Sequence, residues 1–177
     1  MMPFDLNHAY LMNALSNAGG YLAIGLAAIG SAYGAGVAGL AAIGAWKKCY
    51  IQNRPAPFLL VALAGMPLSQ TIYGMILMMV MRGKVQAAAE AAQAAVAAGE
   101  TVAADVQAVF QLWPFFLIMG IAAGVGCMFS SFWQGKTCAY ACDAYGETGK
   151  GFANYIMVAG VIETVSIFVL VFALMVI

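Results

Sequence analysis

Four long apolar stretches constrain what this chain can fold into. Each is long enough to cross the hydrocarbon core of a bilayer, which requires about 20 residues in a helix. Backbone groups inside lipid must pair within their own segment, so helices are the only reasonable interpretation. The predicted spans cover residues 20–46, 58–81, 112–133 (a span open to extension at its end) and 152–177. The sequence therefore predicts an all-α membrane protein.

Composition agrees with lipid as the surrounding medium. Of the 177 residues, 64% are hydrophobic and 8% are charged, whereas a soluble domain carries roughly a quarter charged residues. Seven basic and seven acidic residues cancel, so the chain offers no basic surface for nucleic acid. Residues 1–19 contain no Lys or Arg and are interrupted by polar side chains, which favours a short polar lead over a cleaved signal peptide.

Short echoes divide the chain into two related hairpins. Gly25-Leu-Ala-Ala in the first span recurs as Gly120-Ile-Ala-Ala in the third, and Gln70-Thr in the second recurs as Glu163-Thr in the fourth. The echoes match the span pattern and place polar residues at equivalent points. The predicted domains are a first hairpin at 1–81, an outer connection at 82–111 and a second hairpin at 112–177.

Basic residues near the span ends predict the orientation. Those assigned to the two hairpin loops are Lys47, Lys48, Arg54, Lys136 and Lys150, whereas Arg82 and Lys84 follow the second span. The positive-inside rule then places both hairpin loops in the cytoplasm and both termini outside. The Ala-rich residues 86–98 are expected to be helical and to prolong the spans on the outer side.

Small residues crowd the first span. Gly30 and Gly34 form a GxxxG spacing, and Gly, Ala and Ser occupy many of the other positions. In lipid, such residues let helices approach closely. Packing within one chain explains part of this pattern. A whole span of small residues fits better a helix crowded by identical copies, in a ring or another homo-oligomer.

The four cysteines form no CxxC pair. Cys138 and Cys142 are four residues apart and would share a helix face, but no His lies near them. We therefore interpret the cysteines as small packing residues with free thiols rather than as a metal site. No cofactor is expected.

Glu163 is the only acidic residue inside any predicted span, and it lies almost at the midpoint of the fourth. A charge at the bilayer centre costs about 2.5–3.5 kcal/mol on insertion scales. Such a residue is usually functional, and its partners must be found. The alternative is a structural Glu that stays protonated.

Hairpin geometry supplies candidate partners for Glu163. The turn between the third and fourth spans is expected near residues 146–149, so Gln134 precedes it by about as many residues as Glu163 follows it. At equal rise per residue along antiparallel helices, the two side chains lie at similar depth.

The second span contributes one polar helix face near its midpoint. It carries Met66, Ser69, Gln70 and Tyr73 at i, i+3, i+4 and i+7. Pro67 has no N–H, so it deprives a preceding carbonyl of its helical partner and distorts the turn. Main-chain oxygens there could face an ion, although many membrane helices carry a simple kink.

These groups together offer one carboxylate, two amide oxygens, a hydroxyl and a main-chain carbonyl. A hard cation stripped of water needs about five or six oxygen ligands, whereas a proton needs only the carboxylate and a hydrogen bond. The extra oxygens favour Na⁺, with protons competing at low pH. One carboxylate and one Na⁺ form a neutral unit that passes through lipid at low cost.

At these residues the chain resembles the ring-forming proteolipid (K or c) subunit of V-type sodium-translocating rotary ATPases. The resemblance covers nearly the whole chain. It rests on Met66-Pro-Leu-Ser-Gln-Thr-Ile-Tyr-Gly74, Gln134-Gly-Lys136 and Ile162-Glu-Thr164. Two departures are Ser69, where Thr is more familiar, and the long Ala-rich connection at 82–111.

The resemblance implies a Na⁺ site. Its ligands would be the Glu163 carboxylate, the amide oxygens of Gln70 and Gln134, the Ser69 hydroxyl and the Met66 carbonyl. Tyr73 would donate a hydrogen bond to Glu163 and hold it closed, with Thr164 and Pro67 in supporting positions.

The resemblance also implies partners. Identical copies would form a ring in the inner membrane of a prokaryotic cell, in contact with lipid, with one ion carried per chain. A stator subunit, through an arginine, would open each site for exchange, and a central stalk would connect the ring to a soluble ATPase head. The chain has no GxxxxGK[ST] motif and would be a non-catalytic subunit.

Three other interpretations remain open. A ring of the same kind could carry protons, with the Gln and Ser groups polarising a protonated Glu163. A small secondary transporter or channel could also contain a duplication and a midplane carboxylate. A purely structural membrane protein is the third, and the polar groups at mid-membrane depth count against it.

Overall fold

Helices make up the fold of residues 6–177, the part of the chain that the computed structural model describes, and no strand occurs among them. The elements are α1 (Leu6–Ile51), α2 (Leu60–Gly65), the 3₁₀ turn η1 (Met66–Leu68), α3 (Ser69–Ala97), α4 (Ala104–Gln111), α5 (Trp113–Thr148) and α6 (Phe152–Val176). Four segments of this part are long and apolar enough to cross a membrane, namely α1, the run from α2 to α3, α5 and α6. The predicted all-α fold with four spans is confirmed.

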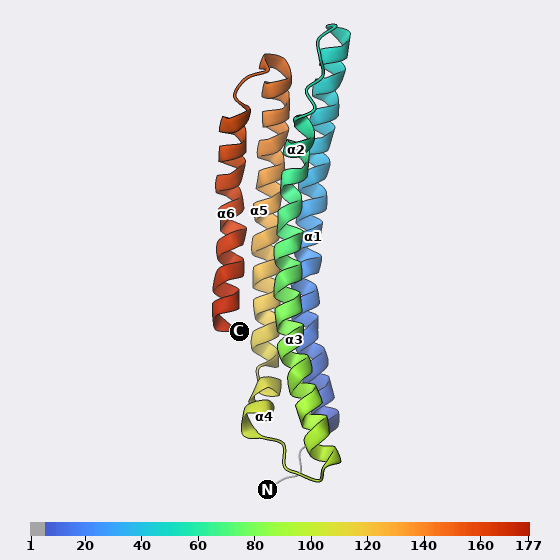
Figure 1. The fold of residues 1–177 in the computed structure, drawn as a ribbon, viewed down its shortest axis with the longest axis vertical. Helices are drawn as coiled ribbons and strands as arrows, with labels where there is room; N and C mark the ends of the chain where they lie inside the picture. The colour runs from blue at the N-terminus through green and yellow to red at the C-terminus, as the bar shows by residue number, and fades with distance from the viewer. Residues whose placement is uncertain (1–5) are drawn as a thin grey trace.

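The two hairpins pack through their first helices. α1 and α5 run side by side and form the most extensive interface, while α3 packs against α1 and α6 packs against α5 (Figure 1). α3 and α6 also contact each other. The two hairpin loops lie at one end of the bundle, and the start of α1 and the connection from α3 to α4 lie at the other (Figure 1).

Glycine permits the close approach of α1 and α5. A Cβ atom on Gly135 would lie 2.2 Å from the Cα atom of Gly34, well inside contact distance. Packing within the chain therefore explains Gly34 of the predicted GxxxG pair. Open space surrounds other members of the same series, namely Gly25, Gly36, Gly39 and Gly44. Intramolecular packing thus accounts for only part of the small-residue pattern.

α1 begins at Leu6, far earlier than the predicted span. The polar lead predicted up to residue 19 is helical from Leu6 onward, which had not been predicted, and residues 1–5 lie outside the described part. The early turns of α1 have something to pack against, because Ala9 belongs to a buried cluster with Ala88 and Ala92 of α3 and Phe110 of α4. Apolar contacts with the C-terminal half of α3 thus stabilise these first turns of α1.

The Ala-rich segment continues α3 as a helix to Ala97, as its helix propensity predicted. The chain turns at Gly99, which has a φ of 71°, and α4 then leads back toward α5. The short helix α4 had not been predicted.

Lys136 lies inside α5, twelve residues before its last residue Thr148, and its assignment to a hairpin loop was wrong. At 1.5 Å per residue this is about 18 Å from the helix end. Between Lys136 and Gly149, where φ is 64°, no Gly or Pro interrupts the helix by its backbone conformation. Phe132 and Trp133 stabilise the cation, whose Nζ lies 4.3 and 5.0 Å from their ring centroids.

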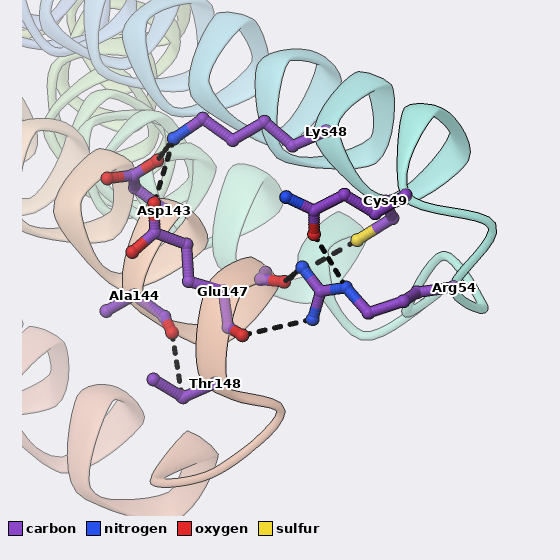
Figure 2. Close-up of polar contacts among 9 residues, drawn as sticks. Lys48, Cys49, Arg54, Asp143, Ala144, Glu147 and Thr148 are labelled. Carbon is purple, nitrogen blue, oxygen red and sulfur yellow. Dashed lines mark hydrogen bonds and ion pairs between the residues drawn. The ribbon is translucent and has the colours of Figure 1, made fainter.

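Ion pairs and hydrogen bonds fasten α1 to α5 at the loop end (Figure 2). Lys48 Nζ lies 2.8 Å from Asp143 Oδ1 and 3.1 Å from Glu147 Oε1. Arg54 donates to the main-chain carbonyls of Gly146 and Glu147 at 3.3 and 3.0 Å. About half of the Lys48 side chain is exposed, so solvent screens both ion pairs and they add little to the stability of the fold.

Candidate functional site

Pro67 creates an irregular turn in the middle of the second membrane segment. α2 ends at Gly65, η1 covers Met66–Leu68, and α3 begins at Ser69. Because Pro67 has no N–H, the regular helical pattern cannot continue through it. The Ser69 N–H instead bonds to the Met66 carbonyl over three residues. The distortion predicted from Pro67 is confirmed, and it places the Met66 carbonyl within reach of the Ser69 hydroxyl, at 3.1 Å.

Glu163 is half-buried on α6 and accepts hydrogen bonds at both carboxylate oxygens. The Tyr73 hydroxyl donates to Oε1 at 2.7 Å, and Gln134 Nε2 donates to Oε2 at 3.2 Å. The donors come from α3 and α5. The similar depth that hairpin geometry predicted for Gln134 and Glu163 therefore holds in the structure.

Two buried amides extend this arrangement toward η1. Gln134 and Gln70 both have 0% exposure. Gln70 Nε2 donates to Gln134 Oε1 at 2.8 Å, and Gln70 Oε1 lies 3.3 Å from the Ser69 hydroxyl. Gln134 Nε2 also donates to the Ala159 carbonyl of α6 at 3.2 Å. A continuous chain of polar contacts thus runs from Ser69 through both amides to Glu163.

No cationic side chain balances Glu163 within the described residues. The ion pairs found in residues 6–177 are those of Lys48 at the loop end, and the two groups that donate to the carboxylate are neutral. A carboxylate at this depth is costly without a counter-charge. The site can therefore bind one monovalent cation or one proton and become neutral.

Thr164 is the one predicted member that the structure does not bring to the carboxylate. Its side chain is exposed and donates to the Val161 carbonyl of its own helix at 2.7 Å. That bond to a preceding carbonyl is the usual one for a hydroxyl within a helix. Tyr73 and Gln134 bond directly to Glu163, whereas Gln70, Ser69 and Met66 are connected to it through the hydrogen-bond chain that passes through Gln134. Pro67 lies in the same 3₁₀ turn as Met66.

Two serines beside the site were missed by the sequence analysis. Ser130 donates to the Ile162 carbonyl at 3.0 Å, and Ser131 donates to the Pro67 carbonyl at 2.7 Å. They precede Gln134 by four and three residues. That spacing puts all three on one side of α5, so it could have identified the serines.

Residues 117–176 match the family model of the ATP synthase C subunit. The match covers about a third of the chain and includes Gln134, Glu163 and most of α5 and α6. No curated protein sequence matches the chain. The second hairpin is thus similar to the ATP synthase C subunit. With four helices long and apolar enough to span a membrane, the chain is a multi-pass integral membrane protein.

Proposed function

We propose that this chain is an ion-carrying rotor ring subunit of a V-type rotary ATPase and that it translocates Na⁺ by reversible binding at Glu163. One observation carries the proposal. A carboxylate without a cationic partner among the described residues ends a chain of buried polar groups at mid-membrane depth. The similarity of residues 117–176 to the ATP synthase C subunit supports the rotor assignment.

The number of oxygen atoms around Glu163 favours Na⁺. The side chains of Gln70 and Gln134 are fully buried. Burial of an amide is costly unless the amide is hydrogen-bonded, so apolar packing alone does not explain two glutamines at these positions. Together with Ser69 and Met66 they supply the oxygens that a dehydrated cation requires. As the side chains lie, Gln134 turns its amide nitrogen toward the carboxylate. Rotation of this amide by half a turn would present Oε1 instead.

A proton is the second candidate cargo, and one observation favours it. Tyr73 Oη lies 2.7 Å from Glu163 Oε1, so a protonated carboxyl could donate to the Tyr73 oxygen if the phenol proton turned away. That step requires no rotation of an amide. Na⁺ binding therefore requires the Gln134 amide to rotate so that its oxygen faces the ion, whereas proton binding does not.

The remaining parts of the machine lie outside this chain. Identical copies would form the ring, with Gly25 and the other open glycines of α1 available for close contact between copies. A stator subunit with an arginine would open the Glu163 site, and a central stalk and soluble ATPase head would couple rotation to ATP. The loops at 52–59 and 149–151 would face the cytoplasm, where Lys47, Lys48, Arg54 and Lys150 outnumber Arg82 and Lys84 on the other side.

Carbodiimide labelling of Glu163 in isolated membranes tests the proposal. The reagent attacks the protonated carboxyl, so bound Na⁺ should protect Glu163 at neutral and alkaline pH, and K⁺ should not. Glu163→Gln gives the background labelling of other carboxyls, and it should abolish transport while the ring still assembles. Labelling that follows pH and ignores Na⁺ would identify a proton carrier. Loss of assembly alone in Glu163→Gln would support a structural role.

A small secondary transporter is distinguished by its oligomeric state. A detergent-resistant ring of many copies is expected here, and gel electrophoresis without boiling or native mass measurement would detect it. A monomer or dimer that carries the labelled Glu163 would contradict the rotor assignment.

A further inference from the structure

The irregular turn at Pro67 is held from the side of α1 and α5. The Ser131 hydroxyl of α5 donates to the Pro67 carbonyl at 2.7 Å, and this bond is buried. Ser131 has 0% exposure, and Ser31 of α1, with 2%, lies 3.4 Å from it. Because Ser131 has a single hydroxyl proton, Ser31 can supply its own proton to the Ser131 oxygen.

α1 packs closely against the same turn at Gly34. A Cβ atom on Gly34 would lie 2.8 Å from Pro67 Cβ and 2.5 Å from the Ser131 carbonyl oxygen. Both are shorter than ordinary contacts, so only glycine allows α1, α5 and η1 to meet at this point. The turn therefore has no room to shift toward α1.

The opposite side of the turn carries the groups of the ion site. The Met66 carbonyl accepts from Ser69 at 3.1 Å, and Ser69 lies 3.3 Å from Gln70 Oε1. The proline ring fixes φ of Pro67. The orientation of the Met66 carbonyl relative to the Pro67 carbonyl therefore depends mainly on ψ of Pro67. A hydrogen bond that fixes the Pro67 carbonyl restricts ψ of Pro67, and it thereby also fixes the direction of the Met66 carbonyl.

We propose that Ser131 is a positioning residue that sets the affinity of the site for a cation. By bonding to the Pro67 carbonyl, it fixes η1 so that the Met66 carbonyl and the Ser69 hydroxyl stay aimed toward the Gln70 and Glu163 side. This inference rests on the proposed function and adds a residue that touches no ion. Ser131 acts through main-chain geometry alone.

Cation binding and proton binding should respond differently to the loss of this bond. A cation uses the oxygens of η1 and Ser69 as ligands, so their misplacement weakens binding. A proton uses the Glu163 carboxyl, which is held by Tyr73 and Gln134 on other parts of the site. Among the described residues, the hydrogen bonds of Ser131 go to Pro67 and Ser31 and not to either of these donors.

The test compares Na⁺ protection of Glu163 from carbodiimide in membranes that contain the wild-type ring, Ser131→Ala or Ser131→Cys. Ser131→Ala should raise the Na⁺ concentration for half-protection about five- to tenfold, the effect of one buried hydrogen bond. Ser131→Cys keeps the volume with a weaker donor, so its effect should be intermediate. The pH dependence of labelling without Na⁺ should stay close to that of the wild type.

Ser16→Ala is the matched control. Ser16 is also a buried serine, with 1% exposure, but its hydroxyl has no hydrogen-bond partner in the described part of the chain. It lies fifteen residues before Ser31 on α1, far from η1. This variant should keep the wild-type Na⁺ dependence.

Each other outcome rejects the inference. An unchanged Na⁺ dependence in Ser131→Ala would show that the bond does not aim the site. Equal shifts in the Na⁺ and pH profiles would show general loosening of the packing. If Na⁺ does not protect Glu163 in the wild type, the proposed function and this inference both fail. If Na⁺ protects the wild type but Ser131→Ala has the same Na⁺ dependence, only this inference fails. If Ser131→Ala fails to assemble, the nearly isosteric Ser131→Cys decides the question alone.

Discussion

The pair of buried amides makes a quantitative prediction about stability. Gln70 Nε2 donates to Gln134 Oε1 at 2.8 Å, and both side chains have 0% exposure. Gln70→Leu leaves an amide oxygen of Gln134 without its donor. Gln134→Leu leaves the Gln70 amide nitrogen and one oxygen of Glu163 without a partner, and it removes the additional bond to the Ala159 carbonyl. The double variant removes both members of the pair at once.

The expected magnitudes follow from the cost of an unpaired buried polar group. That cost is about 1–3 kcal/mol, and hydrogen bonds within membranes average about 0.6 kcal/mol. We expect about 1 kcal/mol of destabilisation for Gln70→Leu and about 2 kcal/mol for Gln134→Leu. The bond between the amides is lost only once in the double variant. Its destabilisation should be about 2 kcal/mol, which leaves a coupling energy of about 1 kcal/mol.

Unfolding in mixed micelles titrated with SDS measures this coupling. The chain contains three tryptophans, and their fluorescence follows the loss of packing at neutral pH. The midpoints of the wild type, both single variants and the double variant complete the cycle. If the two single effects simply add in the double variant, the amides do not pair, and the polar chain that links Ser69 to Glu163 is broken at its centre.

Three further predictions concern neighbouring features. Tyr73→Phe removes the 2.7 Å bond to Glu163 and should speed carbodiimide labelling without Na⁺ at fixed pH by about tenfold or more; an unchanged rate would count against the bond. Gly135→Ala should abolish ring assembly on native gels, because its Cβ would lie 2.2 Å from the backbone of α1, whereas Gly83→Ala on α3 faces open space and should assemble. Lys48→Met removes exposed ion pairs and should leave the midpoint of the same SDS titration close to that of the wild type; a shift as large as that of Gln134→Leu would contradict this expectation.

The span pattern and the centre of the site were predictable because both depend on local spacing. Apolar length indicates the four helices, and the i, i+3, i+4, i+7 spacing puts Ser69, Gln70 and Tyr73 on one face. Gln134 and Glu163 belong to one hairpin, so equal distance from the turn was enough to match their depths. None of these steps required knowledge of how the hairpins pack.

The features that were missed depend on side-chain contacts that the pattern of apolar spans does not show. Ser131 meets Pro67 only because α5 lies against η1, and a spacing rule within one helix does not show that partner. The early start of α1 depends on contact between Ala9 and the C-terminal half of α3. Lys136 was placed in a loop because a cation usually ends a span, but Phe132 and Trp133 hold it on the helix surface.

The duplication explains why two hairpins provide one site. Gln70 in the first hairpin is equivalent to Glu163 in the second. The offset that relates Gly25 to Gly120 makes Gly39 equivalent to Gln134. The first hairpin therefore lacks both the carboxylate and the amide that would build a second site. Its Gln70 instead joins the polar chain that ends at Glu163, the only carboxylate inside the predicted spans. A second carboxylate at that place would add another membrane charge of about 2.5–3.5 kcal/mol and would repel Glu163. An amide there keeps the oxygen and leaves one charge for one cation to balance.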